Sequence, residues 1–102
     1  MKYQLVLQWP NSSLEDFDSL ICIEDQLIDQ LTESHEVDGH DAGTGEMNIF
    51  IITSNFESAF EEVRTILQGD DLWADIRIGY REVDGHEYSA LWPPELRTFH
   101  IT

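Results

Sequence analysis

One carboxylate of this chain falls where an apolar side chain is expected. At about 100° per residue along a helix predicted over residues 12–31, Glu24 lies between Ile28 and Leu31 on the apolar stripe. A carboxylate that faces a core requires hydrogen-bond donors or a cation, or it must stay protonated. One interpretation is a ligand-contacting or acid/base carboxylate at the base of a pocket between helix and sheet. The alternative is a structural Glu that reaches a neighbouring donor.

A second candidate is the segment over residues 35–46, which holds two histidines and four acidic residues. In an extended strand Asp38 and His40 share a face, so their side chains could ligate a divalent metal. Paired cysteines, a helical His-x-x-x-His motif and EF-hand spacing are all absent from the sequence. The alternative interpretation is a solvated turn beside an edge strand.

The outer side of the first helix is predicted to carry three acidic residues and a cysteine. Asp18, Cys22, Asp25 and Asp29 follow one another at helical spacing. Like charges at this spacing destabilise a helix by about 0.2–0.5 kcal/mol per pair. Either a basic partner or ordinary counterions would relieve that repulsion. Cys22 is a poor candidate nucleophile, because the neighbouring acids disfavour its thiolate.

Two arginines and an asparagine join Glu24 as candidate ligand-binding residues. Arg77 and Arg81 alternate with the apolar residues of a predicted strand, which places them on the sheet face opposite the helices. Asn48 lies on a central strand predicted over residues 47–53. The two arginines would meet a ligand or a second copy of the chain there, or they would compensate neighbouring acids.

Charge limits the classes of partner. The 102 residues include five Lys and Arg against 21 Asp and Glu, a net charge of −16, and no Lys or Arg occurs between Tyr3 and Val63. Such a surface repels DNA, RNA and anionic membranes, so direct nucleic-acid or membrane binding is not expected. It attracts basic proteins, although solubility alone would also explain it.

The sequence predicts a single domain over residues 1–102 in a reducing compartment. Its one cysteine forms no internal disulfide, its first residues lack a signal-peptide layout, and its apolar runs are far shorter than a membrane span. We therefore expect a cytoplasmic protein without a cofactor.

Periodicity predicts a strand over residues 2–9 and helices over residues 12–31 and 54–69, each opened by a capping box at Ser12 or Ser54. Further strands are predicted near residues 36–40, 47–53 and 74–80. Asp84-Gly85 predicts a hairpin that returns over residues 86–92, and a short last strand is expected at residues 99–101. The order predicts an α+β fold, a ferredoxin-like βαββαβ two-layer sandwich. Its antiparallel sheet would carry both helices on one face and a C-terminal hairpin extension.

A family resemblance covers residues 1–8, 37–41 and 46–51, together with Tyr80-Arg81 and Trp92-Pro93-Pro94. These stretches are similar to a family of small uncharacterised bacterial proteins. The resemblance implies a bacterial cytoplasmic origin and brings no established activity or site residue. Some members carry transporter-ATPase names, but this sequence has no Walker motif.

Three functions are compatible with these features. The first is a non-enzymatic interaction or regulatory module that binds a basic protein through the acidic face of its first helix. The second is a small-molecule or divalent-metal-binding domain, or a minor enzyme, centred on Glu24 with Asp38, His40 and Asn48. The third is a homodimer formed through the open sheet face.

Overall fold

The computed structural model describes residues 1–10, 17–43, 45–69 and 71–101. Strand β1 (Tyr3–Pro10) coincides with the segment of period-two alternation, and helix α1 (Phe17–Gln30) follows it. The remaining elements are β2 (His35–Gly43), β3 (Glu46–Thr53), α2 (Phe56–Leu67), a 3₁₀ helix η2 (Asp71–Asp75), β4 (Arg77–Glu82) and β5 (Ser89–Trp92).

The strands form a five-stranded sheet in the order β2-β3-β1-β4-β5, and every neighbouring pair is antiparallel. The two most apolar strands, β1 and β3, therefore lie inside the sheet, and the more polar β2 lies at an edge. The predicted α+β class, the antiparallel sheet and the hairpin after β4 are confirmed. The connection between β4 and β5 contains Asp84 and Gly85, as its sequence predicts, but β5 begins at Ser89 and not at residue 86.

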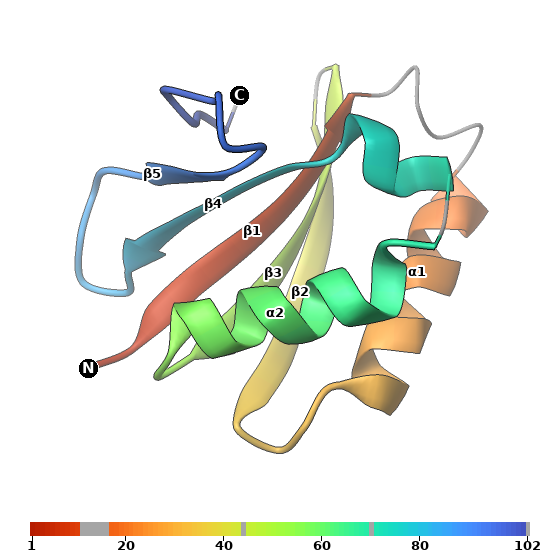
Figure 1. The fold of residues 1–102 in the computed structure, drawn as a ribbon, viewed down its shortest axis with the longest axis horizontal. Helices are drawn as coiled ribbons and strands as arrows, with labels where there is room; N and C mark the ends of the chain where they lie inside the picture. Colours follow the sequence, from red (N-terminus) through yellow and green to blue (C-terminus); the bar gives the residue numbers. More distant parts are fainter. Residues whose placement is uncertain (11–16, 44, 70, 102) are drawn as a thin grey trace.

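Both helices lie on one side of the sheet, and the C-terminal segment runs beside β4 and β5 (Figure 1). The core between helices and sheet is built from aliphatic and aromatic side chains of every layer. On the sheet these are Leu5, Leu7, Trp9, Ile49, Ile51 and Ile78, and on the helices Leu20, Ile23, Leu27, Ala59, Phe60, Val63 and Leu67. The indole Nε1 of Trp9 donates a hydrogen bond to the carbonyl oxygen of Leu72 at 3.0 Å, which satisfies the polar atom of a buried ring.

The structure also corrects the cap of the second helix and the start of β4. The second helix is capped by Asn55, whose side chain accepts a hydrogen bond from the amide of Ser58, and not by Ser54. The strand predicted over residues 74–80 begins later, because η2 occupies residues 71–75. The capping box predicted at Ser12 lies outside the described residues.

The sheet face opposite the helices is not open along β1 and β4. Val6 and Gln8 point to this face and are 0% and 1% exposed. The covering group is the C-terminal segment, where Phe99 is only 4% exposed and its ring lies against Gly79. No strand is seen there among the described residues, so the expected last strand is instead an irregular segment anchored by an aromatic side chain.

We predict that Gly79→Ala detaches this segment. A Cβ at position 79 would overlap the ring of Phe99, so the ring must move or the sheet must distort. Overpacking of this kind typically lowers the free energy of unfolding by about 1–3 kcal/mol. Urea unfolding followed by circular dichroism measures the change.

The matched control is Gly69→Ala, because a Cβ at Gly69 meets no atom within 4 Å. We expect that variant to be as stable as the parent protein or slightly more stable. Equal stability of the Gly79 and Gly69 variants would contradict the proposed anchoring of Phe99.

Candidate functional site

Helix α1 is rotated relative to the sequence prediction. Its buried stripe contains Leu20, Ile23 and Leu27, which are 0–4% exposed, whereas Ile28 is 60% exposed. The prediction had placed Ile28 in the stripe and had left Ile23 out. Glu24 consequently lies at the edge of the buried face and not in its middle.

At that edge Glu24 meets a partner from the sheet. Its Oε2 lies 2.9 Å from Nδ1 of His40 on β2, and 12% of the Glu24 side chain is exposed. The contact joins α1 to the edge strand and supplies the hydrogen-bonding group that a carboxylate at this depth requires. Glu24 is on the helix side of the sheet, whereas Asn48, Arg77 and Arg81 are on the opposite side. The sheet therefore separates the predicted ligand-binding residues into two groups.

The regular alternation that would place Asp38 and His40 on one face is interrupted between them and Val37. A β-bulge interrupts β2 at Asp38, since Val37 pairs with Ile51 while Gly39 pairs with Phe50. His40 points to α1 and Asp38 is exposed. In the described ranges no three His, Cys, Asp or Glu side chains gather into a metal-binding group. A metal site at Asp38 and His40 stays a prediction.

The outer side of α1 is acidic and solvent-exposed. Asp25, Asp29 and Cys22 are all exposed, while the side chain of Asp18 lies outside the described part of the structure. Strand β2 runs beside this helix, and Asp38 is exposed at its bulge, whereas the exposed Glu36 and Asp41 are in register with Ile52 and Asn48, which face away from the helices. Between helix and strand lies a shallow depression of about 460 Å³ lined in part by Leu27, Ile28, Leu31 and Val37. We call this region the α1–β2 surface.

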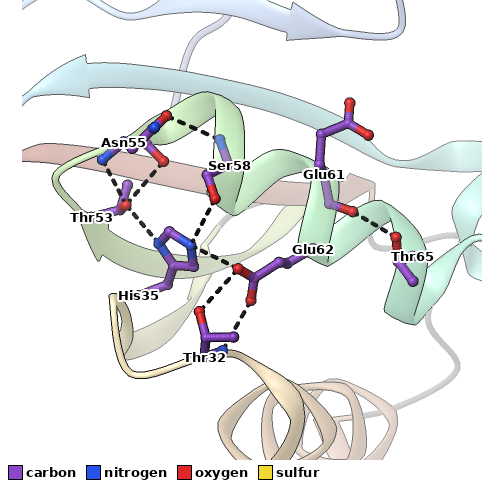
Figure 2. A network of polar contacts seen from close by, with 8 residues as sticks. All are labelled: Thr32, His35, Thr53, Asn55, Ser58, Glu61, Glu62 and Thr65. Atoms are coloured by element: carbon purple, nitrogen blue, oxygen red, sulfur yellow. Dashed lines mark hydrogen bonds and ion pairs between the residues drawn. The ribbon is translucent and has the colours of Figure 1, made fainter.

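A histidine network joins three elements on the helix side of the sheet (Figure 2). His35 is buried, and its Nδ1 lies 2.7 Å from Oγ1 of Thr53 on β3. Its Nε2 lies 3.1 Å from Oε2 of Glu62 on α2 and 3.4 Å from Oγ of Ser58. The same Glu62 carboxylate accepts hydrogen bonds from the amide and the hydroxyl of Thr32, in the turn between α1 and β2.

This network lacks the geometry of a catalytic triad. A triad needs its hydroxyl nucleophile and its carboxylate on opposite ring nitrogens. Here Ser58 and Glu62 share Nε2, and the hydroxyl on Nδ1 belongs to Thr53, which is 0% exposed. The network therefore clamps α2 to β2, β3 and the α1–β2 turn.

Glu62 is the titratable group that this clamp perturbs. Desolvation by partial burial acts to raise the pKa of Glu62, but the two hydrogen bonds from Thr32 and the nearby His35 outweigh it. The net pKa is below its ordinary value of 4.5. The folded protein therefore favours the ionised carboxylate.

The opposite face contains a buried polar cluster. Glu46 is 4% exposed, and its Oε2 accepts hydrogen bonds from Nε2 of Gln8 at 2.6 Å and from Nδ2 of Asn48 at 3.1 Å. Asn48 is fully buried, and within the described part of the chain its Oδ1 has no hydrogen-bond partner. A buried acceptor left unpaired costs about 1–3 kcal/mol.

The two predicted arginines on this side differ in their surroundings. Arg81 is tied to the β4–β5 hairpin, because its Nη1 donates to the carbonyl oxygens of Glu82, Val83 and Gly85 and its Nε donates to Oη of Tyr88. Arg81 therefore holds the turn in place. Arg77 is exposed, and among the described residues its side chain forms no hydrogen bond or ion pair.

The sequence prediction missed Gln8, Glu46, His35 and Glu62 as members of polar clusters. Gln8 on β1 and Asn48 on β3 each alternate with apolar residues that face the helices, so both are expected on the opposite face. That alternation was the available signal for this cluster. No local pattern marks Glu62 as the partner of His35, because the two residues are 27 positions apart.

We predict that Glu62→Gln destabilises the protein near neutral pH and not in acid. Loss of the ionised acceptor should lower the free energy of unfolding by about 1 kcal/mol at pH 7. Because the folded-state pKa is lowered from 4.5, this stabilisation is present above that pH and is lost as the pH falls through the folded-state value. Urea unfolding at pH 7, 5 and 3 measures the difference, with the exposed neighbour Glu61→Gln as the control. A difference independent of pH would contradict the role of the charge.

Neither described helix is long and apolar enough to cross a membrane. Comparison of the chain with protein-family models, with curated proteins and with solved structures gives no match. The resemblance to a family of small bacterial proteins stays a prediction, and the candidate sites rest on contacts, burial and charge.

Proposed function

We propose that this protein is a non-enzymatic interaction module that binds a basic protein through the α1–β2 surface. The observation that carries the proposal is an apolar side chain within an acidic rim. Ile28 is 60% exposed beside the same depression, and Asp25 and Asp29 are exposed on the same helix.

The charge distribution supports a basic partner. Residues 3–63, which include α1 and β2, contain fourteen acidic residues and no Lys or Arg. The repulsion between these acids falls when cationic side chains approach, so association would be fast and sensitive to salt.

The exposed Ile28 and its apolar neighbours favour docking at one defined place, which attraction between charges alone would not specify. Interfaces commonly place apolar anchors inside a polar rim, and the centre contributes most of the binding free energy. Here Leu27, Leu31 and Val37 flank Ile28 in a depression of about 460 Å³. A partner that presents an apolar side chain among basic residues would fit this arrangement.

We also propose that the fold is of the ferredoxin-like type, with β5 as an added edge strand. Two features support this assignment. The first is the strand order β2-β3-β1-β4 with antiparallel pairing throughout. The second is the position of the helices, since one follows β1 and the other follows β3.

We predict that the double variant Asp25→Lys/Asp29→Lys loses its partner. The test is affinity capture from a lysate of the source organism at low salt, followed by measurement of the affinity for the captured basic protein as salt rises. We expect the parent complex to weaken with salt and the variant to bind at least about tenfold more weakly, since charge reversal replaces attraction with repulsion.

The matched control is Glu87→Lys/Glu95→Lys, which changes the net charge equally at exposed positions outside the α1–β2 surface. It should retain binding. A third variant, Ile28→Ser, should weaken binding without changing its salt dependence. Equal loss in both charge variants, or a captured partner that is acidic, would contradict docking through this surface.

A further inference from the structure

A small polar pocket lies on the sheet face away from the α1–β2 surface. Its volume is about 230 Å³, and its sheet residues are Gln8, Glu46 and Arg77. The C-terminal segment forms the remaining wall with Leu96, Thr98, Phe99 and His100. The pocket therefore exists only because this segment folds back over β1 and β4.

The wall is anchored to the floor by direct contacts. Gln8 Nε2 donates to the carbonyl oxygen of His100 at 2.8 Å, and the ring of Phe99 lies on Gly79. The same Gln8 Nε2 also donates to Glu46. One buried amide thus fixes both the tail and the carboxylate, which is the kind of support that a preorganised binding site requires.

The pocket carries one anionic and one cationic side chain. The carboxylate of Glu46 is buried and is oriented by two amide donors, so its position is set in advance. The guanidinium of Arg77 forms no hydrogen bond or ion pair with another described residue, and it can offer a planar pair of N–H donors. A ligand with an ammonium and a carboxylate would complement these two charges.

Strand geometry sets the span between the two charges. Glu46 is on β3 and Arg77 on β4, with β1 between them, and their partners on β1, Pro10 and Gln8, are two residues apart. Two steps of roughly 4.8 Å across the sheet and two residues of roughly 3.4 Å along it place the two Cα atoms about 12 Å apart. The long arginine side chain covers part of that span, and a small molecule that carries both an ammonium and a carboxylate can occupy part of the rest.

We propose that this pocket binds a free α-amino acid with a small side chain. The ligand ammonium donates to Glu46, and the ligand carboxylate accepts a bidentate pair of hydrogen bonds from Arg77. The pocket is smaller than the range of about 300–1,000 Å³ typical of drug-sized ligands, which limits the side chain. Thr98 and the backbone of the tail close the site on its outer side.

The test is titration of the isotopically labelled full-length protein with L-alanine and L-serine, observed by NMR. We expect saturable shifts of the resonances of Gln8, Arg77 and Thr98 at millimolar ligand. Ethylamine and acetate serve as half-ligands, since each offers only one of the two charges. Each should bind at least about tenfold more weakly than alanine, because one ion contact is missing.

Two variants distinguish the site from general charge effects. Arg77→Gln, at an exposed position, should retain the fold and weaken alanine binding at least about tenfold. Arg97→Gln, which also removes an exposed arginine but lies outside the pocket lining, should bind as the parent does.

The proposal is overturned if neither amino acid gives saturable shifts up to about 20 mM. It is also overturned if ethylamine binds as tightly as alanine, or if Arg77→Gln leaves the affinity unchanged. None of these results depends on the α1–β2 surface.

Discussion

Burial of β1 on both of its faces is the constraint on which the rest of the structure depends. Five consecutive residues of this strand, Leu5 to Trp9, are at most 1% exposed. On one face the helices cover Leu5, Leu7 and Trp9 with apolar side chains. On the other face the C-terminal segment covers Val6 and Gln8. A strand buried in this way requires that every polar group on it find a partner.

Gln8 shows how that requirement shapes the second face. Its amide nitrogen is paired with Glu46 and with the backbone of the tail, so a polar side chain in the sheet organises both a buried carboxylate and the chain terminus. Gly79 permits the close approach of Phe99 that completes the cover. The result is a small pocket on this face, partly open to solvent, and an exposed acidic surface on the helix side.

Much of the fold follows from local patterns, and the errors follow from contacts that are not local. Alternation identified β1, a nearly continuous apolar run identified β3, and Asp84-Gly85 identified the β4–β5 turn. The helical period identified α1 but misjudged its rotation, because the exposed Ile28 was placed in the apolar stripe. The prediction for Asp38 and His40 requires regular extended geometry, whereas a bulge interrupts β2 at Asp38.

The amino-acid sequence by itself determined the strand and helix periods, the central positions of the apolar strands and the concentration of negative charge before Arg64. These properties depend on neighbouring residues and on composition. Only the tertiary structure decided that Glu24 pairs with His40 at the edge of the core, while Glu46 is the carboxylate held inside. The contacts responsible join residues 16, 38 and 92 positions apart, and a local period carries no information at such separations. The outward acids of α1 belong to the surface that we propose for a basic partner, and the buried carboxylate is Glu46.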